Sequence, residues 1–170
     1  CTSTRAFTVT ASNIASLEYI EVVDLSDNNS IMILVSGSGN YVYSLDNSFF
    51  QSANLFEGIE AGIYTVYIKD LNGCGIATRE VSVLGIPKYF TPNGDGQNDI
   101  WNIKGVKVSL NSGTVISIFD RFGSLLKQIT PMDSGWDGTF NGVLLPSSDY
   151  WYSIKLQDGR IIKGHFALKR

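Results

Sequence analysis

Histidine is almost absent from this sequence, with His165 as the only one in 170 residues. A Ser-His-Asp triad or a two-histidine metal site would need it. Its neighbours in sequence provide neither a nucleophile elbow nor metal-ligand spacing. No glycine-rich loop follows a strand and opens a helix, as nucleotide-binding folds require. We therefore predict a protein that is not an enzyme and needs no organic cofactor.

Long apolar runs and a surplus of basic residues are also missing. The densest apolar run, Ile31–Val35, is far too short to cross a bilayer. The formal net charge is −3 and the sequence pI is about 5.0. A net negative charge does not indicate a basic surface for nucleic acid or a polybasic patch for a membrane. We expect no nucleic-acid partner and no direct membrane insertion.

A sustained 3.6-residue period is absent as well, so we expect almost no helix. Short segments rich in β-branched and aromatic residues alternate instead with Asn, Gly and Ser turns. Ile63–Asp70 and Tyr150–Leu156 are the clearest of these segments. The pattern is typical of antiparallel sandwiches. The predicted fold is all-β, with two small antiparallel Ig-like β-sandwich domains in tandem.

Pro87 marks the predicted boundary between the domains, which are residues 1–86 and 87–170. Cys1 and Cys74 each stand before an Arg and an alternating strand, about one small domain apart. This repetition is typical of tandem modules, although coincidence between two short strand patterns also explains it. The chain opens on Cys1 without an initiator Met or a signal peptide, so we expect a piece of a longer protein.

The stretch from Phe90 to Trp101 is rich in turn-forming residues. Seven of its residues, 93–99, include two glycines and four Asn or Asp side chains. Asn and Asp bond back to nearby main-chain N–H groups, and Gly reaches positive φ without steric cost. We predict a tightly turned loop whose ends, Phe90 and Ile100–Trp101, are anchored in a core.

Tyr150–Leu156 and Ile161–Leu168 predict a hairpin with an Asp-Gly turn of type I′. Its alternation places one set of side chains on the core side: Tyr150, Tyr152, Ile154, Leu156, Ile162, Phe166 and Leu168. Trp151 then points the other way, together with Lys163 and His165. It is either a partner-facing aromatic or the cover of a second small cluster.

Six segments carry a family resemblance, and they occur in the order Phe90–Trp101, Ile118–Gly123, Gly135–Gly138, Leu145–Pro146, Asp149–Tyr152 and Gly164–Leu168. Together they resemble the gliding-motility-associated C-terminal domain, the type B C-terminal signal of the type IX secretion system of Bacteroidetes. The resemblance covers residues 87–170. Residues 1–86 resemble, more loosely, the repeat modules of large surface adhesins in the same bacteria. The segments that carry this likeness are Tyr41–Asp46, Ala61–Val66 and Asp70–Cys74.

The resemblance implies a targeting signal rather than a catalytic domain. It implies that the domain directs a large cell-surface protein, such as a SprB-like gliding adhesin, across the outer membrane to the cell surface. The implied partners are outer-membrane translocon components of the type IX system and an outer-membrane protein of the PorP/SprF kind. We expect these partners to read the folded domain through a surface that includes Asn93, Asp95, Asn98, Asp99, Trp151, Lys169 and Arg170.

Alternating oxygen donors in the loop raise the question of calcium. Asn93, Asp95, Gln97 and Asp99 alternate as donors do in calcium loops. The pattern departs from an EF-hand, because Gly does not fall at the sixth position and Lys104 replaces the bidentate Glu. A calcium site and a set of self-satisfied Asx turns therefore both stay open.

The two cysteines precede the first and the last predicted strand of their domain. In Ig-like sandwiches these strands can pair, which would bring both cysteines to the same end. We predict a Cys1–Cys74 disulfide, in keeping with an extracytoplasmic location. The alternative is that Cys1 belongs to a preceding module and is unpaired here.

A second function class also stays open, namely a carbohydrate-binding sandwich of a secreted protein. Trp101, Trp136 and Trp151 would be its stacking platforms. Exposed aromatics in a coplanar row would favour this function, whereas aromatics buried between sheets would favour the targeting module.

Overall fold

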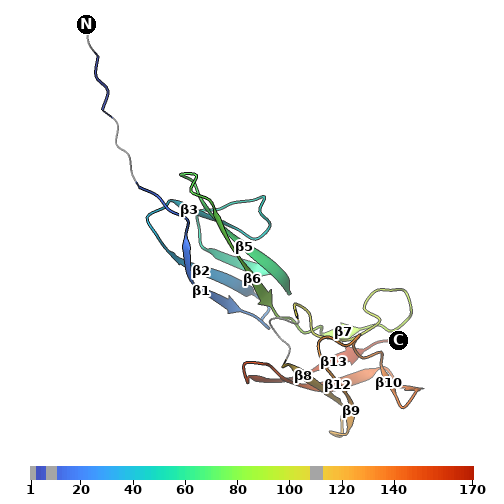
Figure 1. Cartoon of the computed structure of the whole chain (residues 1–170). Coiled ribbons are helices and arrows are strands. Elements are labelled where there is room, and N and C mark those ends of the chain that lie inside the picture. The colour runs from blue at the N-terminus through green and yellow to red at the C-terminus, as the bar shows by residue number, and fades with distance from the viewer. Residues whose placement is uncertain (1–2, 7–10, 108–112) are drawn as a thin grey trace. The chain divides into compact units, whose positions relative to one another are not determined.

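The structure is a computed structural model that describes residues 3–6, 11–107 and 113–170. The described residues contain strands and turns but no helix, so nothing in them forms a helix able to span a membrane. The predicted all-β fold is confirmed (Figure 1). The chain divides into two compact units: unit 2 consists of Asp24–Asp27, Glu60–Ile63 and Ser82–Arg170, and unit 1 of the remaining residues.

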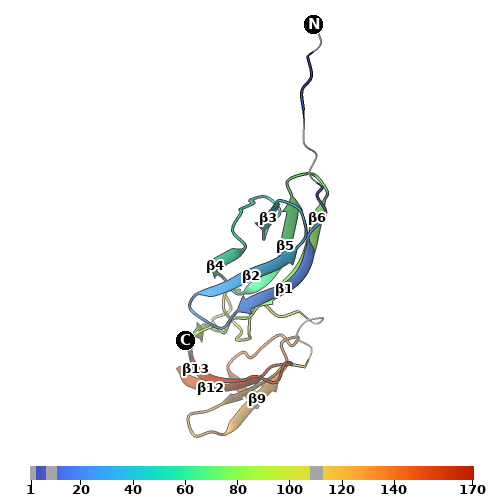
Figure 2. The ribbon, with the colours of Figure 1, turned by 90° about the vertical axis from the view of Figure 1, so that its left-hand side faces the viewer.

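Unit 1 contains two three-stranded sheets, which Figure 2 shows as two layers. One sheet has the order β1-β2-β4 and is formed by Ser16–Val23, Asn29–Ser36 and Leu55–Ile59. The other has the order β3-β5-β6 and is formed by Tyr41–Ser44, Gly62–Asp70 and Ile76–Val83. Alternate residues of both sheets are buried, including Ile31, Ile33, Val66, Ile68 and Val81. Alternation along pleated strands therefore provides the core of this unit.

Unit 2 contains a five-stranded sheet with the order β7-β13-β12-β8-β9. In that order the strands are Tyr89–Phe90, Ile161–Leu168, Ser148–Lys155, Val115–Phe119 and Leu125–Ile129. All its pairs are antiparallel except β13 with β7, which is parallel. A separate two-stranded ribbon is formed by β10 (Thr139–Phe140) and β11 (Val143–Leu144).

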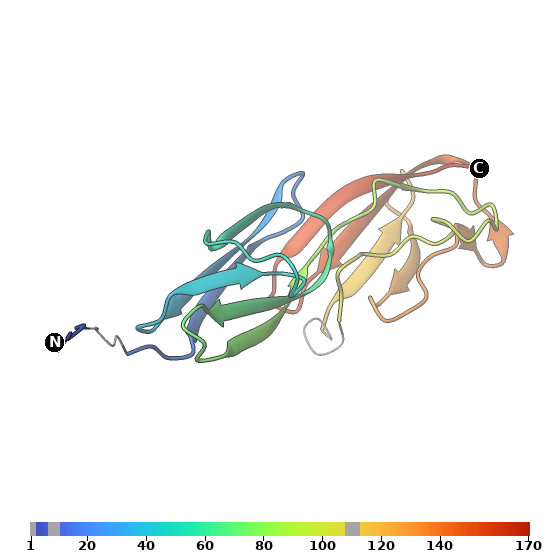
Figure 3. The same ribbon diagram turned by 90° about the horizontal axis from the view of Figure 1, so that it is seen from above.

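Strands β12 and β13 form the predicted hairpin and lie side by side along its length (Figure 3). The predicted type I′ turn is wrong. Type I′ needs positive φ at both central residues, but Gly159 has φ 90° and Asp158 is not in the positive region. The Leu156 N–H donates to the Arg160 carbonyl at 2.9 Å, which leaves a three-residue connection with Gly159 in the left-handed conformation.

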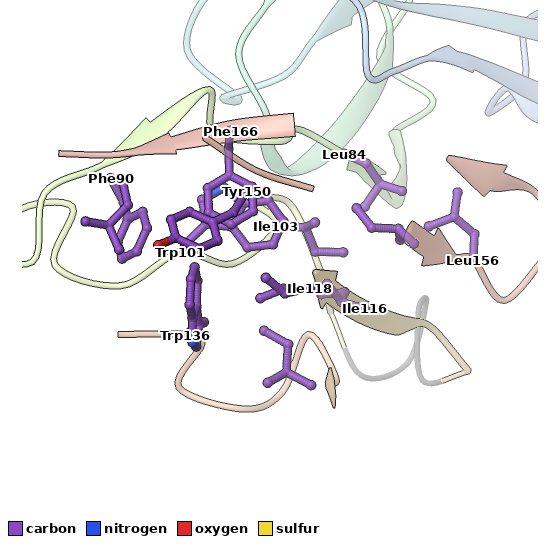
Figure 4. Close-up of a cluster of buried hydrophobic side chains, with 13 residues drawn as sticks. Leu84, Phe90, Trp101, Ile103, Ile116, Ile118, Trp136, Tyr150, Leu156 and Phe166 are labelled. Carbon is purple, nitrogen blue, oxygen red and sulfur yellow. The ribbon is translucent and has the colours of Figure 1, made fainter. Parts of the chain in front are cut away.

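The core of unit 2 lies on one face of the five-stranded sheet and is rich in aromatic side chains (Figure 4). Phe166 is fully buried, and its ring stacks on that of Trp101 with a centroid distance of 3.9 Å. The predicted core face of the hairpin is confirmed: Tyr150, Ile154, Leu156, Phe166 and Leu168 are buried, and Tyr152 and Ile162 pack against them. Two isolated bridges, Gly85 with Lys104 and Trp101 with Trp136, hold the opposite side of this core.

Candidate functional site

The Phe90–Trp101 loop is fixed at both ends by buried aromatic side chains. Phe90 belongs to β7, and Phe90 and Trp101 both have no exposed surface. The Trp101 indole N–H donates to the Pro87 carbonyl at 2.9 Å. The Thr91 N–H donates to the Asn98 carbonyl at 2.7 Å and closes the neck of the loop. The predicted anchoring therefore holds for Phe90 and Trp101, whereas Ile100 is 45% exposed.

Inside the loop, the Asp99 carboxylate collects backbone N–H groups. It accepts hydrogen bonds from Gly94 at 2.7 Å, Gly96 at 2.7 Å and Asn93 at 2.9 Å. These bonds, led by that from Gly94, hold the pKa of Asp99 below its ordinary value because they favour the charged carboxylate. The two glycines have φ values of 80° and 83°, a region that L side chains rarely adopt.

Asp95 and Asn93 complete the same network. The Asp95 carboxylate accepts from the Gln97 N–H at 2.7 Å and from the Asn93 side-chain amide at 2.9 Å. The Asn93 side-chain oxygen, Oδ1, accepts from the Asp95 N–H at 3.0 Å. Three of the four residues predicted for calcium, Asn93, Asp95 and Asp99, therefore already accept hydrogen bonds within the loop through their side-chain oxygens, in the manner of Asx turns.

The calcium site at Asn93, Asp95, Gln97 and Asp99 stays a prediction. No three or more His, Cys, Asp or Glu side chains form a metal-holding group within the described parts of the chain. That search does not include the amide oxygens of Asn93 and Gln97, on which the predicted site also depends.

Two of the three tryptophans proposed as carbohydrate platforms are inside the core. Trp101 is 0% and Trp136 is 1% exposed. Trp136 packs edge-on against Tyr150 and Phe166, at centroid distances of 5.1 and 5.9 Å. Neither indole face is available for a sugar, so a row of stacking tryptophans is not present. Trp151 alone among the three is exposed, at 40%.

Trp151 lies on the face of the five-stranded sheet opposite the core, which we call the outer face. Its direct neighbours there are Phe119 on β8 and His165 on β13. The ring centroids of Trp151 and His165 are 6.4 Å apart. Alternation along β12 and β13 also places Ser153, Lys155 and Lys163 on this face, with Asp149 at one end.

A hollow of about 420 Å³ lies beside Trp151 on the outer face. It is lined by β8, by the turn after it, and by the middle of β12 and β13; the lining includes Phe119, Arg121, Trp151, Ser153 and Lys163. The sequence alone did not identify Arg121 or Phe119 as site residues. Asp120–Gly123 has the Asp and Gly that are typical of a turn, but its position beside Trp151 depends on the β8–β12 pairing.

Lys169 and Arg170, two predicted partner contacts, bind within unit 2. The Lys169 ammonium lies 4.6 Å from the centroid of the Tyr89 ring. The Arg170 guanidinium donates to the carbonyls of Leu145 and Gly138, the latter at 3.2 Å. The Arg170 contacts join the residues after β13 to the segment before β12, and the Lys169 contact joins them to β7. A role in partner binding stays a prediction for both residues.

Cys74 is exposed in the turn between β5 and β6. Its N–H donates to Asp70 at 3.3 Å, and the Asp70 carboxylate raises the pKa of the Cys74 thiol. Cys1 lies outside the described residues, and so does the predicted Cys1–Cys74 disulfide.

Solved structures share only a distant likeness with this chain. The BSP domain of a biofilm associated protein is 13% identical, with a TM-score of 0.32, over 90% of this chain and 29% of that one. Dimeric latent PorU from Porphyromonas gingivalis is 15% identical, with a TM-score of 0.32, over 91% of this chain and 20% of that one. This chain thus spans less than a third of either protein, and TM-scores this low support no inference about function.

No curated protein matches the sequence. A family match covers residues 84–168, half of the chain and most of unit 2. The matched segment begins at buried Leu84 and ends at buried Leu168, and it contains the loop, the aromatic core and the outer face. Through this segment the chain belongs to the CHU_C family of type IX secretion signal domains.

Proposed function

We propose that this chain is a C-terminal targeting module that takes a large cell-surface protein through the type IX secretion system. The cargo in this proposal is an adhesin linked to gliding motility in Bacteroidetes, and unit 1 is one of its repeat modules. The match of residues 84–168 to the secretion signal family carries the proposal.

Membership of the family supports the general part of this proposal, which is export by the type IX secretion system. A type IX secretion signal implies interaction with the type IX secretion system and export to the cell surface or outer membrane. The family is not an enzymatic one. The finer identity of the partner, an outer-membrane protein of the PorP/SprF kind, belongs to the proposal.

Recognition of the folded domain, rather than of a linear peptide, is supported by the topology of unit 2. The two residues of β7 pair with Ala167 and Leu168 near the end of β13. Strand β13 lies between β7 and β12, so it is an inner strand of the sheet. The first and last parts of the matched segment are thus interlocked, and neither offers a free extended peptide. The loop and the outer face are two exposed surfaces of unit 2 that a partner of the folded domain can contact.

The test is export of a reporter fused in front of the whole chain. Residues 1–170 are used because unit 2 includes Asp24–Asp27 and Glu60–Ile63. The reporter should reach the cell surface of a bacterium that has the type IX system and should be retained in a mutant that lacks the translocon. Surface display that does not depend on the translocon would contradict the proposal.

Two sets of variants locate the recognised surface. Asp95→Ala combined with Asp99→Ala removes both carboxylates of the loop, and Trp151→Ala alters the outer face. Circular dichroism first selects the variants that remain folded. A folded loop variant that is not exported assigns the loop to the recognised surface. Normal export of every folded variant would show that the partner reads another part of unit 2.

A further inference from the structure

Residues 84–170 carry a charge of opposite sign to that of the whole chain. They contain ten Lys and Arg residues and seven Asp residues but no Glu, which gives a formal charge of +3, whereas the whole chain has −3. The net charge of the whole chain does not show this excess of basic residues, because residues 1–83 carry a larger negative charge. The distribution of the basic residues over the fold indicates which surface is positive.

The acidic residues of this segment are used in turns. Six of the seven accept a hydrogen bond from a backbone N–H group in their own turn, as Asx turns do: Asp95, Asp99, Asp120, Asp133, Asp137 and Asp158. The seventh, Asp149, is on β12 with its Oδ1 4.0 Å from the His165 Nδ1. Negative charge is therefore concentrated in turns. Asp149 is on the outer face, and Asp120 lines the hollow beside Trp151, next to Arg121, with its carboxylate bonded to the N–H groups of Phe122 and Ser124.

The basic residues of the outer face have no such partners. Lys155 and Lys163 are exposed, and neither forms an ion pair within the described ranges of the chain. Lys163 lines the hollow beside Trp151, and Arg121 lines it from the turn after β8. The Arg121 guanidinium is 4.8 Å from the centroid of the exposed Phe122 ring. The face thus combines unpaired cations with aromatic surface around one concavity.

We infer that the outer face of the five-stranded sheet binds an acidic, extended segment of the export partner, with Lys155, Lys163 and Arg121 pairing its carboxylates beside Trp151. This inference rests on the proposed function, because it takes the partner to be a protein of the secretion system. Charge complementarity selects an anionic occupant. Side chains on one face of a strand recur every ~7 Å, so acidic residues at alternate positions of an extended segment match the lysines on β12 and β13.

The concavity favours a polypeptide over a lipid surface. A flat bilayer surface would contact the rim of the face but would leave the hollow of about 420 Å³ beside Trp151 empty. An apolar side chain of a peptide can enter that hollow while its acidic neighbours reach the surrounding cations. Acidic polysaccharide and anionic lipid are accordingly the competing outcomes in the test.

Tryptophan fluorescence gives a direct binding assay. Trp151 is 40% exposed, whereas the other two tryptophans are 0% and 1% exposed, so a ligand on the outer face changes the emission of one residue. The probe is poly-L-glutamate, added to the whole chain. We expect a saturable change that weakens as the salt concentration rises, because exposed charges are screened. The change should be absent in Trp151→Phe.

Charge reversal on and away from the face provides the matched comparison. Lys155→Glu with Lys163→Glu should weaken poly-L-glutamate binding at least tenfold. Lys69→Glu with Lys104→Glu changes the net charge by the same amount at exposed positions elsewhere and should alter binding less than twofold. Equal losses in the two variants would overturn the inference, because overall charge would then explain the binding. Saturation by phosphatidylglycerol vesicles or by polygalacturonate, with no response to poly-L-glutamate, would also overturn it.

The same two variants are then compared in the reporter fusion. We expect Lys155→Glu with Lys163→Glu to be folded but retained, and Lys69→Glu with Lys104→Glu to be exported. Export of both variants would overturn the docking surface and leave the proposed function intact. Failure of the unmodified fusion to be exported would overturn the proposed function and, with it, this partner.

Discussion

Replacement of Phe166 by Ala should cause a large loss of stability in unit 2. Its ring is fully buried and stacked on Trp101 at 3.9 Å, and it lies 5.9 Å from both Phe90 and Trp136. Truncation of a buried Phe to Ala costs roughly 3–5 kcal/mol. The loss of several aromatic pairs, each contributing about 0.5–1.5 kcal/mol, places this site toward the upper end. A cost of about 4 kcal/mol lowers the melting temperature of a domain this small by roughly 15–30 °C.

Thermal unfolding followed by tryptophan fluorescence measures this loss selectively. All three tryptophans belong to unit 2, so their emission reports this unit. Phe122→Ala is the matched control, because Phe122 is 79% exposed in the same unit. We expect the control to change stability by less than about 0.5 kcal/mol. Equal shifts for Phe166→Ala and Phe122→Ala would refute the aromatic cluster as the main source of stability.

Three further predictions concern individual contacts. Gly138→Ala should destabilise the protein far more than Gly142→Ala in urea titrations: both have φ 79°, but a Cβ at Gly138 would lie 2.5 Å from Leu168 and one at Gly142 meets nothing. Equal costs would attribute the effect to the backbone alone. Tyr150→Phe should lower the free energy of unfolding by about 1 kcal/mol, because the Tyr150 hydroxyl donates to the Pro146 carbonyl at 2.8 Å. An unchanged urea midpoint would show that this hydrogen bond does not stabilise the protein. Protonation of Asp70 should lower the stability of the protein in acid. The hydrogen bond from the Ser12 hydroxyl is the largest of the contacts that depress the pKa of Asp70 in the folded protein. The stability that the Asp70 carboxylate contributes is therefore complete above its pKa of about 4 in the unfolded chain, and it is lost as the pH falls below that value. Asp70→Asn should therefore flatten the fall in melting temperature below pH 4, and an identical acid profile would contradict this.

Local sequence patterns were sufficient for features that depend on neighbouring residues. The alternation in Tyr150–Leu168 predicted the buried face of the hairpin, because successive side chains of a strand point to opposite faces. The glycines and Asx residues of the 93–99 loop predicted its tight turns for a similar reason. The error at Asp158-Gly159 shows the limit of a dipeptide rule, since the length of the connection also selects the turn.

Features that depend on distant pairings were beyond this reasoning. The bridge between Trp101 and Trp136 buries both indoles, and no local pattern indicates that these two segments meet. The pairing of β8 with β12 likewise brings Arg121 to the hollow beside Trp151. Without that register, the basic residues of the outer face are scattered along the sequence and Trp151 has no assigned neighbours.

The central position of β13 has a consequence for protein synthesis. A ribosome makes β7 first and β13 last, yet β13 is the strand that joins β7 to β12. The sheet is therefore incomplete until nearly the whole matched segment has left the ribosome. A nonsense or frameshift product that ends before Ile161 would lack this strand and could not present the folded export domain. Placement of the last-made strand inside the sheet thus makes folding of the domain depend on synthesis of the complete matched segment.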